Sequence, residues 1–277
     1  MLQYYFKFIT NVDPSYKNLN YKKTKIRIIK YIKKKFIKKN NRVELNENIS
    51  FYHPKVSFGN ITSLNLLEID ELFIFRYYLK NYKLYDQFID IGANIGTHSI
   101  INAKLGLKVL SFEPDPWHIN LLKKNIKKNK ISKIKLFKYA VSNNNKKTSF
   151  TRVLGNTTGS HISGSKTNVY NEIEKFNVNV LSAKNIIKAN SLIKIDAEGE
   201  EAKILLSLNN QQFSKNDFIC EIGSKNNAKK IYQKLKKENI NSYAQKINFR
   251  KVKNFSDLPI SYKEGSLFIS LNNLWKV

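Results

Sequence analysis

The sequence predicts a doubly wound α/β fold, in which helices cover both faces of a mostly parallel sheet. Six short apolar segments have the length and composition of buried strands: residues 87–91, 108–112, 133–138, 191–195, 217–221 and 266–270. Segments with helical spacing lie between them: residues 96–104, 115–129, 200–208 and 228–238. This alternation is typical of a parallel sheet, which binds its ligand beyond the carboxyl ends of its strands.

The 277 residues are enough for one large hydrophobic core, and we expect them to form two parts. Residues 81–277 form the α/β domain. Residues 1–80 form an N-terminal extension, with a basic helix at 21–39, a short strand near 49–52 and a helix at 69–79. The segment 142–171 is rich in Thr, Ser, Gly and Asn, and it predicts a long loop between the third and fourth strands.

The predicted helix at residues 21–39 is amphipathic. Its basic face carries Lys23, Arg27, Lys30, Lys34 and Lys38. Its apolar face carries Ile26, Ile29, Ile32, Phe36 and Ile37. One interpretation is attachment to an anionic membrane surface. The other is docking of the apolar face on the protein's own domain, with the lysines in solvent.

The net charge of +28 results from 49 lysines and arginines against 21 acidic residues. Two explanations are open. A coding bias would inflate Lys, Asn and Ile throughout the chain, whereas an anionic partner would be an acidic glycan, a lipid surface or a nucleic acid. Nucleic acid fits worst, because arginine, which reads bases and phosphates bidentately, is scarce.

The cellular compartment is indicated by three further features. Cys220 is the single cysteine and cannot form an internal disulfide. The first residues lack the pattern of a signal peptide, and the apolar runs are too short to span a bilayer. We therefore expect a cytoplasmic protein, with peripheral membrane contact through residues 21–39 as an alternative. The sequence does not indicate the oligomeric state.

The turn after the first strand reads Asp90-Ile-Gly-Ala-Asn-Ile-Gly96. Gly92 and Gly96 allow close approach of the backbone to a ligand, and the following helix offers free N–H groups. The G-x-G-x-x-G pattern of dinucleotide-binding folds is absent, because Gly92 is followed by Ala and Asn94. The carboxylate of Asp90 suits a ligand that carries an ammonium group.

Acidic residues also follow the other predicted strands. Glu113 comes about twenty residues after the glycine loop, where a carboxylate accepts hydrogen bonds from ribose hydroxyls. Asp196 and Glu198 follow the fourth strand, and Glu221 closes the fifth. Carboxylates at such positions suit a general base, a ligand hydroxyl or a metal ion. The small residues at 140–142 suit an adenine ring.

These motifs together resemble the FkbM family of methyltransferases. The residues that carry the resemblance are 90–96, 111–116, 140–142, 193–199 and 219–221, within a matching region of about 85–272. The resemblance implies a Rossmann-like class I methyltransferase fold, with a seven-stranded, mostly parallel sheet whose last strand is antiparallel. It also implies S-adenosylmethionine as cofactor, and methyl transfer to an oxygen of a sugar, a glycan or a related small-molecule acceptor.

The resemblance also implies site residues by position. The methionine part of the cofactor would be surrounded by Asp90, Gly92, Asn94 and Gly96. The ribose would contact Glu113, and the adenine would contact Ala140, Val141 and Ser142. The transferring methyl and the acceptor would face Asp196 and Glu198. In one respect the chain departs from the family, which has an Asp where this sequence has Ser182.

Several assignments stay open at this point. The general base is Asp196, His161 or His98, and a divalent metal would find candidate ligands in Asp196 and Glu221. One alternative function is that of a non-catalytic binding protein with this fold, tethered to an anionic surface through residues 21–39. Another is that of an NAD-dependent oxidoreductase, which the missing dinucleotide pattern disfavours.

Overall fold

The computed structural model describes residues 9, 13, 14, 18–38, 40–166, 172–273 and 275. The last part of the polar segment, residues 167–171, lies outside the described residues. So does residue 39 at the end of the basic helix, as do the side chains of Ile37 and Lys38.

The central sheet has eight strands within the described residues, in the order β13-β12-β14-β11-β10-β3-β4-β5. They are β3 (Gln87–Ile91), β4 (Lys108–Phe112), β5 (Ile134–Phe137), β10 (Ser191–Ile195), β11 (Asn216–Glu221), β12 (Ser242–Ala244), β13 (Arg250–Lys251) and β14 (Ser266–Ile269). Strand β14 runs antiparallel to both β11 and β12, whereas β10, β3, β4 and β5 pair in parallel. The predicted seven-stranded sheet with an antiparallel last strand is confirmed, and the two-residue β13 extends it at one edge.

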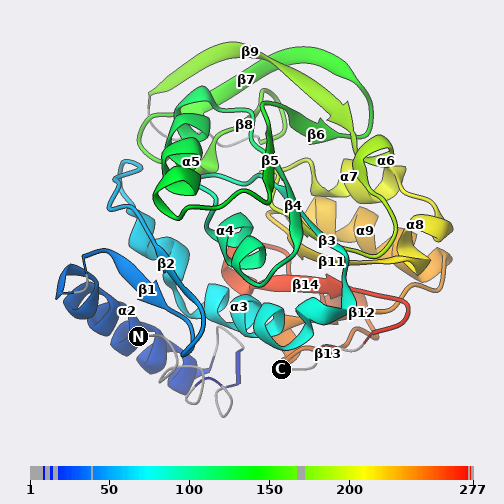
Figure 1. The fold of residues 1–277 in the computed structure, drawn as a ribbon. Coiled ribbons are helices and arrows are strands. Elements are labelled where there is room, and N and C mark those ends of the chain that lie inside the picture. The colour runs from blue at the N-terminus through cyan, green and yellow to red at the C-terminus, as the bar shows by residue number, and fades with distance from the viewer. Residues whose placement is uncertain are drawn as a thin grey trace.

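Helices cover both faces of this sheet (Figure 1). Side chains alternate along each strand, so Phe88 and Leu192 enter one apolar core while Ile89 and Ile193 enter the other. The first core is closed by α3 (Ile69–Asn81) and α4 (Thr97–Lys104), next to which lies α5 (Pro116–Lys128). The second is closed by α6 (Ala183–Ile186), α7 (Glu201–Ser207), α8 (Asn210–Ser214) and α9 (Lys225–Lys237).

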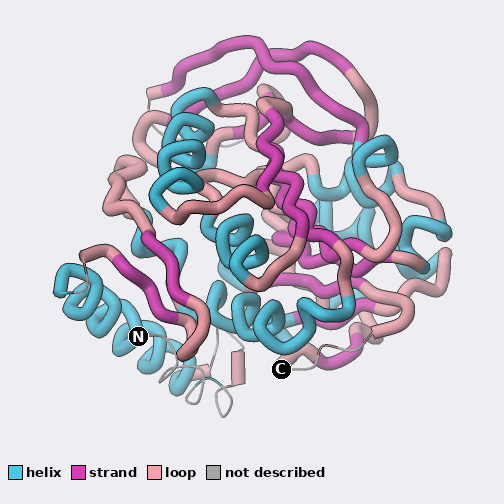
Figure 2. The backbone as a smooth tube through the Cα atoms, in the orientation of Figure 1, coloured by secondary structure: helices cyan, strands magenta, loops and turns pink. Residues whose placement is uncertain are grey.

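A second sheet occupies the segment for which we predicted a loop, so that prediction was wrong. It contains β6 (Ala140–Ser142), β7 (Lys146–Val153), β8 (His161–Ile162) and β9 (Ile173–Ser182), in the order β6-β9-β7-β8. Figure 2 shows its long strands arching over the top of the molecule. Phe150, Val178 and Val180 form a small core with Ala140 and Ile162. A sheet with one face in solvent needs apolar residues only at alternate positions, and the many polar residues between them concealed the pattern.

The N-terminal extension packs against the first core. It contains α2 (Leu19–Lys38), β1 (Arg42–Glu44) and β2 (Ser50–Tyr52). Ile28, Ile32 and Phe36 of α2 are buried in the same cluster as α3 and the sheet. The docked interpretation of the basic helix is therefore the one that the structure supports. The placement of Ile26 on the buried face was wrong, because it lies about 160° around the helix from Ile28 and is 56% exposed.

Ion pairs fix the orientation of α2. Lys25 Nζ lies 2.9 Å from Glu68 and 3.5 Å from Asp70, and the Tyr21 hydroxyl donates to Asp70 at 2.5 Å. Lys23, Arg27, Lys30 and Lys34 are left in solvent. In the part of the chain that the structure describes, no helix is long and apolar enough to cross a membrane. Attachment of the basic face to an anionic membrane stays a prediction, as does the cytoplasmic location.

Candidate active site

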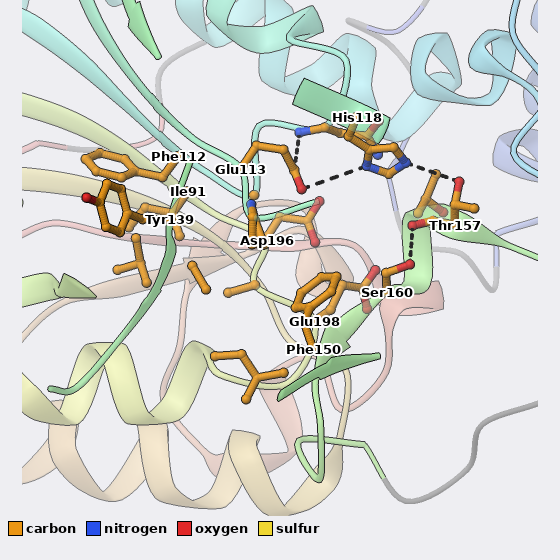
Figure 3. A pocket seen from close by; sticks show the side chains of 18 residues that line it. Ile91, Phe112, Glu113, His118, Tyr139, Phe150, Thr157, Ser160, Asp196 and Glu198 are labelled. Carbon is orange, nitrogen blue, oxygen red and sulfur yellow. Dashed lines mark hydrogen bonds and ion pairs between the residues drawn. The ribbon is translucent and has the colours of Figure 1, made fainter. Parts of the chain in front are cut away.

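The carboxyl ends of the parallel strands meet the second sheet around a cavity, shown in Figure 3. Seven predicted site residues line it: Gly92, Asn94, Glu113, Ala140, Val141, Asp196 and Glu198. Phe112 and Tyr139 lie together at one end, while His118, Thr157 and Ser160 lie at the other. Glu113 and Asp196 stand between these two groups.

The glycine loop brings two strand ends into close contact. Gly92 has a φ of +80°, and a Cβ at this position would lie 1.8 Å from the backbone oxygen of Asp196. Gly96 has a φ of +84° and precedes α4, and there a Cβ would lie 2.0 Å from Leu122 of α5. Gly92 thus allows β3 and β10 to present their ends to the same cavity. Gly96 serves the packing of α4 against α5 and is not among the lining residues.

Substitution of Gly92 by Ala should therefore destabilise the protein strongly. We expect the free energy of unfolding to fall by about 2–5 kcal/mol, because backbone strain at positive φ adds to the collision with Asp196. Thermal and urea unfolding would measure this loss. The matched control is Gly106→Ala, where φ is also positive but nothing lies within 4 Å of the added Cβ. That variant should lose only about 1 kcal/mol. Equal losses in both variants would contradict the proposed collision.

Glu113 lies buried in the cavity wall. Its Oε2 accepts a hydrogen bond from the backbone N–H of Asn94 at 2.8 Å, and its Oε1 accepts one from that of Asp115 at 2.9 Å. Burial raises the pKa of Glu113 to about 8, although these two hydrogen bonds act in the opposite direction. Each carboxylate oxygen keeps a second lone pair for a ligand hydroxyl.

His118 and Thr157 were not predicted, although both line the cavity beside Glu113. His118 Nε2 lies 3.1 Å from Thr157 Oγ1, and burial lowers the pKa of His118 to about 4, so its ring is neutral at pH 7. The N-terminal extension supports both residues. The Phe58 carbonyl accepts a hydrogen bond from the Thr157 N–H at 2.9 Å, and the Phe58 ring packs edge-on against His118. Only the folded chain brings these three segments together.

Asp196 and Glu198 differ in how their carboxylates are held. Asp196 Oδ2 accepts from Lys194 Nζ at 3.0 Å, while its buried Oδ1 has no hydrogen-bond partner among the described residues. Glu198 is paired with Lys166 and accepts a hydrogen bond from the Tyr262 hydroxyl. Burial raises the pKa of Glu198 against the effect of Lys166. Asp196 thus keeps one carboxylate oxygen that has no hydrogen-bond partner among the described residues, and this oxygen is buried.

Lys194, which the sequence did not single out, lies next to the candidate site and pairs with Asp196. It is 3% exposed, lies near the carboxyl end of β10, and shares with Leu192 the face of the strand that packs against α3 and α4. Burial alone would lower the pKa of Lys194, but the carboxylates of Asp196, Asp90, Glu221 and Glu71 raise it well above its usual value. A lone lysine in an apolar strand was the available signal, since buried lysines occur almost only in pairs with acids.

The remaining predicted residues surround the cavity without lining it. Asp90 is fully buried, with Oδ2 bonded to the Ser99 hydroxyl at 2.5 Å and Oδ1 without a partner among the described residues. Ser142 donates a hydrogen bond to Glu200. Glu221 ends β11 near Lys194, and the pKa of Glu221 is raised by burial and by Asp196. The predicted roles of these three residues in the site stay predictions.

Neither histidine candidate lines the cavity. His161 lies in β8 with Nδ1 3.0 Å from the Gly159 carbonyl oxygen. His98 lies in α4 between Tyr78 and Glu71, with Nε2 3.0 Å from the Glu71 carboxylate. Ser182, where the family has an Asp, donates to the Asn143 carbonyl oxygen at 3.0 Å and does not line the cavity either. Among the described residues, no group of three or more His, Cys, Asp or Glu side chains could hold a metal ion.

Comparison with known proteins decides the family. The family model described as Methyltransferase FkbM domain matches residues 90–244, which is more than half of the chain. The chain belongs to the FkbM methyltransferase family. It is therefore an S-adenosylmethionine-dependent methyltransferase, and the oxidoreductase and non-catalytic alternatives no longer apply. No curated protein matches the FkbM chain.

Three solved methyltransferase structures illustrate the likeness. The ribosomal protein L11 methylase from Lactobacillus delbrueckii subsp. bulgaricus is 14% identical, with 83% of this chain and 96% of that chain covered and a TM-score of 0.40. The N-terminal domain of human METTL16 in complex with SAH is 15% identical, with coverages of 88% and 82% and a TM-score of 0.39. The precorrin-6y C5,15-methyltransferase from Geobacter metallireducens GS-15 is 11% identical, with coverages of 71% and 85% and a TM-score of 0.37. Because these TM-scores are low, the assignment of the fold and the family depends on the strand order of the sheet and on the family match alone.

The residues of this FkbM cavity fit the cofactor. Glu113 offers lone pairs to the ribose hydroxyls, and Phe112 and Tyr139 provide an apolar end for the adenine ring. Gly92 lines the cavity without a side chain, so the loop backbone itself can approach the ligand. Asp90 is buried beside the cavity lining, and its Oδ1, which has no hydrogen-bond partner among the described residues, suits the ammonium group of the cofactor.

Proposed function

We propose that this FkbM methyltransferase transfers the methyl group to a hydroxyl of a sugar, a glycan or a related small-molecule acceptor. The observation that carries the proposal is the carboxylate of Asp196 in the cavity wall, whose buried Oδ1 has no hydrogen-bond partner among the described residues. A hydroxyl must lose its proton as it attacks, so its methylation needs a base at hydrogen-bond distance. A cavity bordered by the carboxylates of Asp196 and Glu198 also disfavours acceptors that are themselves anionic at the reacting atom.

Asp196 acts as the general base in this proposal. Lys194 holds Oδ2 and thereby aims Oδ1, so the carboxylate keeps one orientation while it removes the proton. Glu198, fixed by Lys166 and Tyr262, orients a second acceptor hydroxyl. His161 has no role in this scheme, because its ring is bonded to the Gly159 carbonyl and lies outside the cavity lining.

S-adenosylmethionine supplies a methyl group on a positively charged sulfur with a good leaving group, so most of the rate enhancement can come from alignment. The chain contributes that alignment in three places. Glu113 would hold the ribose, the loop at Gly92 and Asn94 would hold the methionine part, and Asp196 would hold the acceptor hydroxyl. The second sheet covers this cavity with Phe150 and Ile162 and limits the access of water, which would otherwise compete as an acceptor.

The class of acceptor can be tested by product analysis. Purified protein and S-adenosylmethionine would be incubated with three matched panels: neutral glycosides, amines and carboxylic acids. Mass spectrometry and NMR would locate the new methyl group. We expect O-methyl ethers from the glycosides, and at least about a hundredfold slower product formation with Asp196→Asn. Methylation of amines or carboxylates alone would refute the proposal, because neither product requires the base at Asp196 in the same way.

The pKa of Glu113 leads to a prediction on cofactor binding. The side chain is protonated below about pH 8 and accepts two ribose hydroxyls best as a carboxylate, so affinity should rise with pH. Between about pH 7 and pH 9 the affinity for S-adenosylhomocysteine should increase by up to about tenfold, with the midpoint near pH 8.

Isothermal titration at several pH values would measure this dependence. Glu113→Gln is the control, because it keeps the shape and loses the titrating proton. It should bind more weakly than the parent protein and lack the rise in affinity. An equal rise in Glu113→Gln would show that another group is responsible.

A further inference from the structure

A groove with a volume of about 680 Å³ lies along the outer flank of α9, on the side of the segment that follows β13. Two aromatic rings, Tyr232 and Phe255, form its apolar part and pack edge-to-face with centroids 5.9 Å apart. Four lysines border it: Lys225, Lys229, Lys236 and Lys237. It shares no lining residue with the cofactor cavity.

The positive charge of this groove is not compensated locally. Among the described residues none of the four lysines has a carboxylate within ion-pair distance. Two acids near the groove, one at the end of α9 and one beside Phe255, are occupied elsewhere. Glu238 pairs with Lys234 on the other flank of the helix, and Asp257 accepts hydrogen bonds from the backbone N–H groups of Lys253 and Asn254.

The position of Lys225 adds a second observation. It lies in the first turn of α9, where the helix dipole is positive and where acidic residues are favoured, yet this turn has no acid. A lysine here costs stability instead of adding it, and it combines with the free N–H groups to attract an anion. Lys236 and Lys237 lie in the last turn of α9, where the negative end of the helix dipole partly offsets their positive charge. The charge of the groove is thus greatest at the end that follows the carboxyl edge of β11.

The shape of the groove selects among anionic partners. From Lys225 to Lys237 it follows about 18 Å of one helix, which suits an extended chain and not a flat membrane surface. Its described lining residues include no arginine, which disfavours a nucleic acid. The face of an aromatic ring attracts the polarised C–H groups of a sugar ring. Tyr232 supplies such a ring between the lysines, with Lys236 Nζ lying over it at 5.9 Å from the centroid.

We propose that this groove binds an acidic oligosaccharide, a chain of sugars that carry carboxylate or sulfate groups. The proposal rests on the proposed function, since it provides a docking site for the glycan that carries the reacting hydroxyl. Glu221 ends β11 and Lys225 begins α9, so the basic end of the groove lies on the same edge of the sheet as the cofactor cavity. A glycan bound along α9 is thereby retained at the edge where methyl transfer takes place.

Direct binding tests the groove without any methyl transfer. Oligogalacturonate fragments would be titrated into the full-length protein, with neutral maltooligosaccharides of equal length for comparison. We expect the acidic fragments to bind at least tenfold more tightly. The double variant Lys229→Glu/Lys236→Glu should lose at least tenfold in affinity for them. Tyr232→Ala should weaken the binding of both sugars, because stacking does not depend on charge.

The matched control is Lys123→Glu/Lys127→Glu, which changes the net charge equally on the exposed side of α5. An equal loss in this control would overturn the proposal, since binding would then follow net charge alone. So would preference for single-stranded DNA of equal charge, or for vesicles that contain phosphatidylglycerol. If the groove variant binds normally while Asp196→Asn loses methyl transfer, the groove fails and the proposed function stands. If the groove variant loses glycan binding while Asp196→Asn keeps methyl transfer, the groove proposal stands and the assignment of Asp196 as general base is refuted.

Discussion

Replacement of Asp196 by Asn should lower kcat for methyl transfer by about 10²- to 10⁴-fold, the range expected when a general base is lost. Asparagine preserves the size of the side chain and its contact with Lys194 but cannot remove a proton. The affinity for S-adenosylhomocysteine should change by less than about threefold, because Glu113 and the glycine loop are untouched. Single-turnover kinetics and isothermal titration would separate these two quantities.

Two companion variants define the role of Asp196. Glu198→Gln should retain more activity, since its carboxylate is already held by Lys166 and Tyr262 and acts by orientation. His161→Ala should leave kcat nearly unchanged, because His161 does not line the cavity. If His161→Ala lost as much activity as Asp196→Asn, the base would be assigned to the wrong residue.

The central fold was predictable because its strands are buried on both sides. Segments such as 87–91 and 191–195 are nearly continuous apolar runs, and the predicted limits of β3 and β10 agree with the structure. The second sheet was missed because only one of its faces is buried, so Phe150 and Val178 stand isolated among polar residues. Strand β12 was missed as well, because a strand of three residues is too short to show the alternation of apolar and polar residues.

The residues of the candidate site also fall into a predictable and an unpredictable group. Glu113 and Asp196 could be named because the carboxyl end of a parallel strand is a fixed place in the fold. His118 and Thr157 could not, because they reach the cavity only when α5 and the second sheet pack against Phe58 of the extension. Contacts between segments that are distant in the sequence produce no recognisable motif or spacing.

Replacement of Lys194 by Met should be the most destabilising of these substitutions. The chain loses the one cation that faces Asp196, Asp90, Glu221 and Glu71 from within the strand, and Met keeps the volume. Removing one partner of a buried ion pair costs about 3–5 kcal/mol, so we expect a loss of that size in the free energy of unfolding. Urea unfolding at pH 7 would measure it. The loss should shrink as the pH is lowered, because carboxylates without their cation take up protons and become neutral.

Two comparisons distinguish this effect from a general loss of packing. Lys203→Met makes the same substitution at a half-exposed lysine and should cost less, because Ser142 and Ser165 still donate hydrogen bonds to its buried partner Glu200. Lys194→Met combined with Asp90→Asn should lose less than the sum of the single variants, because the second change removes one of the repelling charges. Additive losses, or a deficit independent of pH, would mean that Lys194 contributes by packing alone. Its role in aiming the Asp196 carboxylate would then fail, since that role depends on the same ion pair.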